Sequence, residues 1–226
     1  MQANLAIQLT KALSSERLSA YQQRGNQGGN LELFSHYVWN MALSESLYST
    51  LQVLEVTLRN TIHATASQHF QREDWFNSTA VISFQNDVEA LNKAKRTLQR
   101  QRKPLDPGRI IAELNFGFWT SLLDKRYEQT LWPRLLKSAF PHMPRRARTR
   151  QILSRRFHKI RKLRNRIFHH EPIWYWRDLK QQHQDILEAI AWIEPAAKDL
   201  VVAIDRFPAV YQTGLAEIER ELKKFC

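Results

Sequence analysis

The chain has 226 residues, of which 43% are hydrophobic and 11% aromatic, so it can bury a substantial core and is not expected to be disordered. Its 34 Lys and Arg residues exceed its 22 Asp and Glu residues, which gives a formal net charge of +12. The only cysteine, Cys226, excludes an intrachain disulfide, and neither a signal peptide nor an apolar membrane-spanning stretch is recognisable, so we expect a cytoplasmic protein without a membrane partner.

Turn-forming residues are scarce, with six Gly and eight Pro in the whole chain. These are too few for a many-stranded sandwich or barrel, and the abundance of Leu, Ala, Gln, Arg, Glu and Lys favours helices. We therefore expect an all-α fold. Its predicted parts are an N-terminal helix with a flexible loop over residues 1–30 and a helical domain over residues 31–226.

The first predicted helix covers residues 15–24, with Ser14 or Ser15 as its N-cap, and is followed by the glycine-rich residues 25–30. One long helix is predicted from residue 31 to about residue 70, because this stretch contains no Pro or Gly. Apolar residues recur in it at steps of three and four, as on the face of a core or dimer helix. These residues are Leu43, Leu47, Leu51, Leu54, Leu58 and Ile62.

Further helices are predicted in the remaining residues. One contains Phe84, Val88, Leu91 and Leu98 and ends in the basic residues 100–103, and a short one starts at Pro107. Residues 115–119 are predicted to form an aromatic turn, residues 127–139 a helix that Pro133 begins or interrupts, and Pro141 and Pro144 a loop. A basic helix is predicted over residues 146–168 and stops at Glu171 and Pro172. Residues 178–203 and 207–225 form the last two predicted helices.

The positive charge is concentrated in one segment. Residues 129–170 contain thirteen Lys and Arg and no Asp or Glu. Such a surface attracts polyanions, chiefly because phosphates release their counterions on binding, so we expect RNA as a partner. A solvated helix face is the other interpretation of a basic run. The residues assigned to RNA binding are Arg155, Arg156, Lys159, Lys162 and Arg166.

Motifs for bound cofactors are missing. The sequence contains no GxGxxG and no GxxxxGK followed by Ser or Thr, and its eight histidines form no HExxH. Without cysteine partners these histidines are a poor metal set. We expect no cofactor and no metal.

The end of the basic helix combines an amide, an imidazole and a guanidinium. Asn165 and His169 are four residues apart and share one helix face, and the long side chain of Arg164 can reach forward to them. Cleavage of RNA without a metal needs a base for the 2′-hydroxyl, a cation for the phosphorane and an acid for the leaving oxygen, and His and Arg suit these roles. The alternative is that His169 and His170 merely finish a helix whose C-terminal dipole favours cations.

The string RNRIFHHEPI resembles the R-N-x-x-x-H signature of the HEPN superfamily, and specifically of its Abi-like (abortive infection) proteins. Two other blocks carry the same resemblance: residues 37–63, which start with YVWN, and residues 114–132, LNFGFWTSLLDKRYEQTLW. The resemblance implies a HEPN-like helical bundle with additional helices, a homodimer, and a metal-independent endoribonuclease of a phage-defence or toxin–antitoxin system, with an antitoxin protein or RNA as a possible partner. It assigns the catalytic roles to Arg164, Asn165 and His169, with His170 as a competitor.

A second polar set lies in the long helix and comprises Glu55, Arg59, Asn60 and His63. An intrahelical salt bridge between Glu55 and Arg59 explains part of it. The functional interpretation is that these side chains orient the catalytic groups. The tryptophans are expected to be core residues, except that residues 174–176 can offer a stacking surface for a base. The alternative to an enzyme is a non-catalytic RNA-binding protein that holds a structured RNA through its basic helix.

Overall fold

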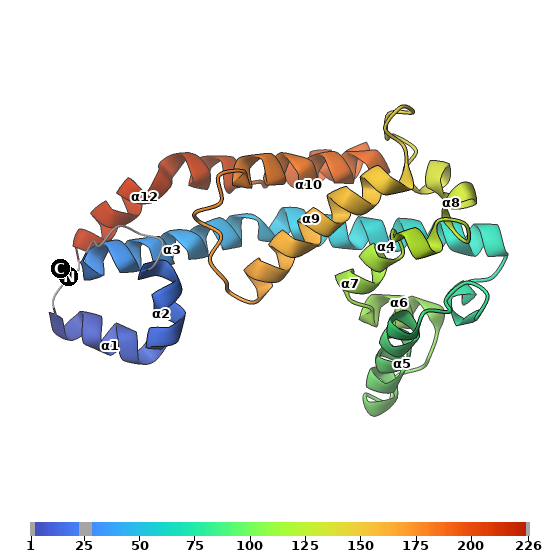
Figure 1. Cartoon of the computed structure of the whole chain (residues 1–226), viewed down its shortest axis with the longest axis horizontal. Coiled ribbons are helices and arrows are strands. Elements are labelled where there is room, and N and C mark those ends of the chain that lie inside the picture. The colour runs from blue at the N-terminus through green and yellow to red at the C-terminus, as the bar shows by residue number, and fades with distance from the viewer. Residues whose placement is uncertain (1–2, 23–28, 225–226) are drawn as a thin grey trace. The chain divides into compact units, whose positions relative to one another are not determined.

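The computed structural model describes residues 3–22 and 29–224, and within these residues it consists of helices, turns and loops without a strand (Figure 1). The predicted all-α class is therefore confirmed. Among the same residues, no helix is long and apolar enough to cross a membrane.

The chain forms two compact units, each assembled from separate stretches of sequence. Unit 1 comprises Met1–Leu51, Leu163–Gln184 and Ala203–Cys226, and unit 2 comprises Gln52–Lys162 and Asp185–Val202. The boundaries between the units fall inside helices α4 (Tyr48–Phe70), α9 (Arg150–Phe168) and α10 (Leu179–Ile193).

Unit 1 is built on helix α3 (Asn30–Ser46), against which α2 (Ser15–Gln22) and α12 (Phe207–Lys223) pack (Figure 1). Helix α1 (Ala3–Leu13) packs on α2 and was not predicted from the sequence. Ser14 separates the two with a φ of 64°, and its hydroxyl caps α2 by accepting the Arg17 amide at 3.3 Å, as one of the two predicted caps. The core of this unit includes the buried residues Ala6, Leu18, Tyr21, Leu33 and Phe34.

Three predicted helices that involve unit 1 differ from the observed ones. The helix predicted over residues 15–24 is described to Gln22, and its last two residues and most of the predicted loop 25–30 lie outside the described residues. The helix predicted over residues 31–70 is divided at Leu47 into α3 and α4, and the buried hydroxyls of Ser46 and Thr50 on either side of the division donate to carbonyls three residues back.

The helix predicted over residues 178–203 consists of α10 and α11 (Pro195–Val202), because Pro195 cannot continue the hydrogen bonding of α10. The last helix, predicted to reach residue 225, is described to Lys223 and is kinked at Gly214, which has a φ of 71°. The apolar stripe predicted in the long helix is nevertheless confirmed, since its six residues are all at most 3% exposed.

Unit 2 contains α5 (Gln85–Arg100), which packs on α6 (Pro107–Glu113) and α7 (Phe116–Ser121), and also α8 (Trp132–Ala139). Two short 3₁₀ helices also belong to this unit: η1 (Trp75–Asn77) precedes α5, and η2 (Lys125–Tyr127) lies between α7 and α8 in the sequence. Pro107 and Pro133 stand in the first turns of α6 and α8, as predicted. The largest fully buried side chains of this unit are Trp75, Trp119, Tyr127, Phe76, Phe140 and Phe157.

Two predictions in unit 2 were wrong. Residues 115–119 are the start of helix α7 and not a turn, because the Asn115 side chain accepts the Phe118 amide at 3.0 Å and caps the helix. The basic helix starts at Arg150 and not at residue 146, because the Thr149 hydroxyl accepts the Ile152 amide at 3.2 Å.

Candidate functional site

Helix α9 ends in a Schellman motif formed by His170 of the predicted site and by Glu171. The amide of His170 donates to the carbonyl of Ile167 at 3.0 Å, and the amide of Glu171 donates to the carbonyl of Arg166 at 2.8 Å. His170 has a φ of 56°, a left-handed conformation that glycine usually supplies at this position. The helix therefore ends at Phe168, as predicted, and a histidine in the left-handed conformation, rather than Glu171 and Pro172, ends it.

The segment after the helix is fixed to other elements of unit 1. The guanidinium of Arg17 donates to the carbonyl of His170 at 2.9 Å. The side-chain oxygen of the buried Asn40 accepts the amides of Ile173 at 2.7 Å and Trp174 at 3.2 Å. The ring of Trp174 in turn stacks on His36, with 3.9 Å between the ring centroids. The position of the two histidines is thus set by α2 and α3 as well as by α9.

The predicted catalytic residues lie on the last turn of α9 and just beyond it. Asn165, His169 and His170 are exposed, and the His169 amide donates to the Asn165 carbonyl at 2.9 Å, which confirms their predicted spacing along the helix. Arg164 is half-buried, and its guanidinium carbon lies 4.0 Å from the centroid of the Phe168 ring. The imidazoles are therefore open to a ligand, while the guanidinium is supported by an aromatic ring.

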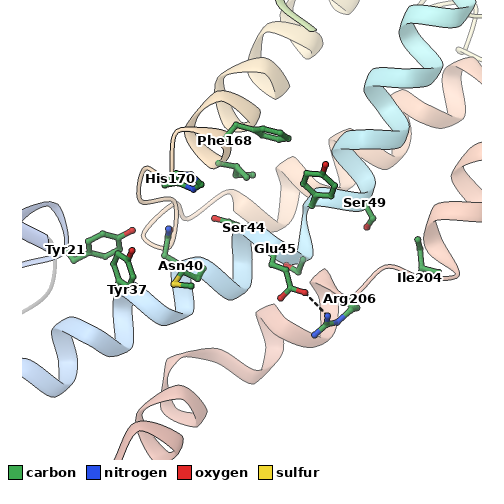
Figure 2. Close-up of a pocket in the computed structure, with 14 residues that line it drawn as sticks. Tyr21, Tyr37, Asn40, Ser44, Glu45, Ser49, Phe168, His170, Ile204 and Arg206 are labelled. Carbon is green, nitrogen blue, oxygen red and sulfur yellow. Dashed lines mark hydrogen bonds and ion pairs between the residues drawn. The ribbon is translucent and has the colours of Figure 1, made fainter. Parts of the chain in front are cut away.

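A cavity of about 620 Å³ lies beside this helix end, and sequence reasoning missed it (Figure 2). Its wall includes Tyr37, Asn40, Ser44, Tyr48, Phe168 and His170. The rings of Tyr48 and Phe168 stack with 5.7 Å between their centroids and an interplanar angle of 28°. A volume in this range suits a small molecule or a single nucleotide.

The unusual backbone of His170 gives a test of why a histidine occupies that position. Replacement of His170 by Gly should raise the free energy of unfolding by about 0.5–1 kcal/mol, because glycine adopts the left-handed conformation without steric cost. The same replacement removes the imidazole from the cavity wall, so RNA affinity or cleavage should fall. Urea unfolding and RNA assays of the same variant measure both effects.

Arg102 provides the matched control for stability. It also has a φ of 56°, and it ends α5 in the same manner, since the Lys103 amide donates to the Leu98 carbonyl at 2.9 Å. Arg102→Gly should give a similar gain in stability. A His170→Gly variant that is more stable and fully active would show that the imidazole has no functional role.

Three of the five basic side chains assigned to RNA binding contact acidic residues of the protein itself. Arg156 pairs with Glu188 at 2.6 Å, Lys159 lies 3.7 Å from Asp185, and Arg166 lies 3.2 Å from Glu171. Arg155 and Lys162 are exposed, and no ion pair connects either of them to another residue in the ranges 3–22 and 29–224. These two side chains are therefore the most available for phosphates.

The second polar set belongs to unit 2, whereas the RNRIFHH segment belongs to unit 1. The guanidinium of Arg59 donates to Asn60 at 3.1 Å, and the Trp75 indole donates to Nδ1 of His63 at 3.2 Å. Burial lowers the pKa of His63 and favours the neutral ring that accepts this bond. Glu55 is half-buried. His63 thus has a clear packing role within its own unit.

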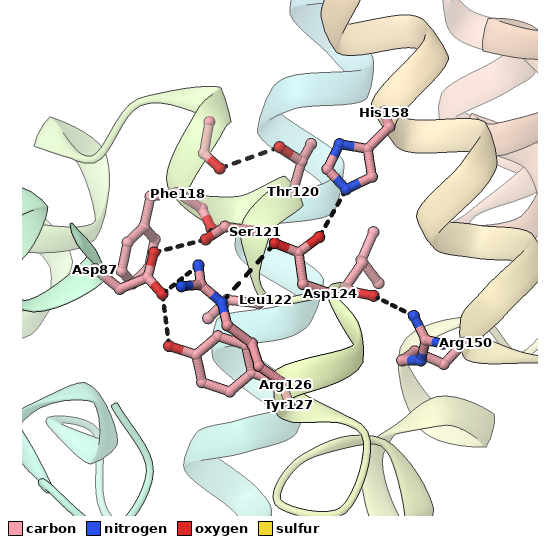
Figure 3. A network of polar contacts seen from close by, with 12 residues as sticks. Asp87, Phe118, Thr120, Ser121, Leu122, Asp124, Arg126, Tyr127, Arg150 and His158 are labelled. Carbon is pink, nitrogen blue, oxygen red and sulfur yellow. Dashed lines mark hydrogen bonds and ion pairs between the residues drawn. The ribbon is translucent and has the colours of Figure 1, made fainter. Parts of the chain in front are cut away.

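A buried polar network in unit 2 was also missed from the sequence (Figure 3). Asp87 is 3% exposed and accepts the hydroxyls of Ser121 at 2.8 Å and Tyr127 at 2.7 Å. Arg126 pairs with it at 2.7 Å and lies 3.8 Å from Asp124, which contacts His158 at 2.7 Å. Both carboxylate oxygens of Asp87 thus have partners from the same unit, so we assign the network to stability.

Burial also makes the stability depend on pH. It lowers the pKa of His36, His63 and His183, although Asp205, at 2.7 Å from His183, partly opposes the shift for that ring. The unfolded chain therefore takes up protons at a higher pH than the folded one. The free energy of unfolding should fall as the pH drops below about 6.5, by at most about 1.4 kcal/mol per pH unit for each histidine.

His36→Phe tests this dependence, because it keeps a ring to stack on Trp174 and removes the titrating group. We expect urea unfolding between about pH 7.5 and 5.5 to show a smaller loss of stability in this variant than in the native chain. Phe34→Leu is the control, since it changes the same core without removing a proton site. Equal pH dependence in the native chain and in His36→Phe would contradict the assignment to His36.

No group of three or more His, Cys, Asp or Glu that could hold a metal ion is found in the described part of the chain. Comparison of the chain with protein-family models, with curated proteins and with solved structures gave no match. Its function is therefore inferred from its own residues.

Proposed function

We propose that the chain is a metal-independent endoribonuclease of the HEPN, Abi-like type, acting in phage defence or in a toxin–antitoxin system. The observation that supports this best is the end of α9, where two exposed histidines follow Arg164 by more than one helical turn and one of them, His170, lines the cavity. The RNRIFHHEPI string supports the family assignment. RNA is the proposed substrate, and an antitoxin protein or RNA would restrain the enzyme.

The proposed reaction uses the 2′-hydroxyl of the substrate as nucleophile. One imidazole removes its proton, the 2′-oxygen attacks the adjacent phosphorus, and the bond from phosphorus to the 5′-oxygen breaks. The leaving 5′-oxygen takes a proton from a second imidazolium. Arg164 stabilises the negative charge that develops on the phosphorane, a task for which a permanently charged guanidinium is well suited. The products are a 2′,3′-cyclic phosphate and a 5′-hydroxyl.

One copy of the chain supplies few groups for this reaction, namely one Arg, one Asn and two His. A homodimer with a two-fold axis near the RNRIFHH segments would supply them twice and surround the phosphate from two sides. We therefore propose that the active form is a homodimer. Light scattering at the assay concentration tests this, and a strict monomer with full activity would contradict it.

Electrostatic binding should depend on Arg155 and Lys162, for which the described residues provide no ion pair. Replacement of both by Gln should reduce the slope of log affinity against log salt concentration by about 0.7 for each phosphate of single-stranded RNA that is no longer neutralised. Filter binding or fluorescence anisotropy at several salt concentrations measures the slope.

The matched control is the double variant Arg220→Gln with Lys224→Gln, which also removes two exposed cations. These two pair with Glu217 and Glu221 within or at the end of α12, so we expect a smaller change in slope. Equal changes in the two double variants would indicate a general charge effect and would contradict the assignment to Arg155 and Lys162.

The decisive experiment incubates the purified protein with total RNA in EDTA and maps the new ends by sequencing. Cleavage that leaves 2′,3′-cyclic phosphates supports the proposal. Binding without cleavage at every protein concentration favours the non-catalytic RNA-binding protein instead, in which Arg164 and His169 serve as phosphate contacts.

A further inference from the structure

The cavity beside His170 contains a hydrogen-bond donor that the fold fixes but does not use. Asn40 is 3% exposed, and its side-chain oxygen is occupied by the amides of Ile173 and Trp174. These two bonds determine which end of the amide is oxygen and leave the NH₂ group as the free end. No hydrogen bond from this NH₂ group to the described residues is present, and Asn40 lines the cavity, with its nitrogen on the side of His170 in Figure 2.

A second polar group in the same wall lacks a partner. The hydroxyl oxygen of Ser44, one helical turn after Asn40 on α3, is buried and makes no hydrogen bond within the described residues. Buried polar groups without partners are rare in folded proteins, and they require a specific explanation. A ligand that accepts a hydrogen bond from Ser44 provides this explanation, and the same ligand can accept one from the NH₂ group of Asn40 in the same wall.

The remaining walls are aromatic. Tyr48 stacks on Phe168, whose ring also contacts the Arg164 guanidinium, and Tyr48 is 50% exposed, so it offers ring surface to a ligand in the cavity. Tyr21 and Tyr37 meet edge to face at 5.3 Å on another part of the wall. Aromatic rings around a few fixed polar groups are typical of sites for flat, aromatic ligands that carry hydrogen-bond acceptors.

We propose that this cavity binds one unpaired nucleobase, which presents a carbonyl oxygen to the NH₂ group of Asn40 and stacks on the ring of Tyr48. The proposal rests on the proposed function, because the base would belong to an RNA substrate. His170 belongs both to the cavity wall and to the RNRIFHH segment, so a base held here would lie next to the phosphate to be cut. A free nucleotide carries the same chemistry and is the other source of such a base.

Binding is tested with a probe that cannot be cut, a single-stranded decamer of 2′-O-methyl uridine, measured by fluorescence anisotropy. Tyr48→Ala should weaken binding about 5- to 150-fold, the range expected for the loss of one stacking partner. Asn40→Asp keeps the oxygen that accepts the two amides but replaces the donor, and it should weaken binding by at least about tenfold. Leu200→Ala, a change of a side chain that is 68% exposed and outside the cavity, should bind like the native chain.

Tyr48→Ala keeps the test decisive if Asn40→Asp fails to fold, because Tyr48 is half exposed. Unchanged affinity of Tyr48→Ala would overturn the base site. The 2′-O-methyl adenosine decamer is expected to bind more weakly than the uridine one, and equal binding would overturn the role of the carbonyl oxygen. Competition by uridine monophosphate alone, with no binding of the decamer, would overturn RNA as the source.

The same variants separate this proposal from the proposed function. If the native chain binds the decamer through Tyr48 but cuts no RNA, the endoribonuclease assignment fails and the base site stands. If Tyr48→Ala binds and cuts like the native chain while His169→Ala cuts nothing, the base site fails and the endoribonuclease assignment stands.

Discussion

His169→Ala is expected to lower RNA cleavage by about 10² to 10⁴-fold while RNA affinity stays within a few-fold of the native value. The imidazole is exposed at the end of α9 and makes no side-chain hydrogen bond within the described residues, so its removal leaves the fold intact. A group that transfers a proton affects the transition state much more than the bound substrate. Single-turnover cleavage and equilibrium binding of an uncleavable RNA give the two quantities separately.

Variants of the neighbouring residues identify which histidine transfers the proton. A normal rate in His169→Ala together with a loss in His170→Ala would move the proton transfer to His170 and keep the mechanism. Arg164→Ala should reduce both affinity and cleavage, because the guanidinium can contact the phosphate before and during the reaction. Loss of affinity in His169→Ala with no separate loss of rate would make His169 a phosphate contact only.

The substrate offers an independent control. Replacement of the ribose at the cut site by 2′-deoxyribose removes the proposed nucleophile, so cleavage there should stop even in the native protein. EDTA should leave the rate unchanged. Continued cutting of the deoxy-substituted RNA would contradict the mechanism whatever the histidine variants show.

Periodic and local features could be predicted from the sequence, because they depend on neighbouring residues. The apolar stripe from Leu43 to Ile62 is buried as predicted, and Pro107 and Pro133 mark helix starts. The division of the long helix at Leu47 was not predicted. The hydroxyls of Ser46 and Thr50 donate to backbone carbonyls there, but Thr57 does the same within the uninterrupted α4, so these residue types alone do not predict a division.

The residues of the candidate site were named from the sequence, but their surroundings were not predicted. The spacing of Asn165 and His169 follows from the helical repeat. The cavity could not be predicted, because it joins residues of α2, α3, α4, α9 and the segment before α12, most of which are far apart in the sequence. The availability of the cations also depends on contacts between distant residues. A count of cations could not show that Arg156 pairs with Glu188, 32 residues later.

Asp87 shows most clearly that contacts between distant residues could not be predicted from the sequence. Its replacement has the largest expected effect on stability. Asp87→Ala should lower the free energy of unfolding by about 3–5 kcal/mol, because it leaves the Tyr127 hydroxyl and the Arg126 guanidinium without their buried partner. Burial, and after it the neighbouring carboxylate, raise the pKa of Tyr127, so its hydroxyl stays protonated and needs an acceptor. Urea unfolding monitored by circular dichroism measures the loss.

Asp106 is the matched control, since it also has an ion pair, with Arg109, and caps α6, but its side chain is 42% exposed. Asp106→Ala should lower the free energy of unfolding far less than Asp87→Ala, because water replaces the exposed carboxylate as a partner of the groups around it. Asp87→Asn, which keeps the shape and one acceptor but loses the charge, should fall between the two. Equal losses for Asp87→Ala and Asp106→Ala would show that burial of the network adds nothing, and Asp87 would then be no more important to the fold than a surface cap.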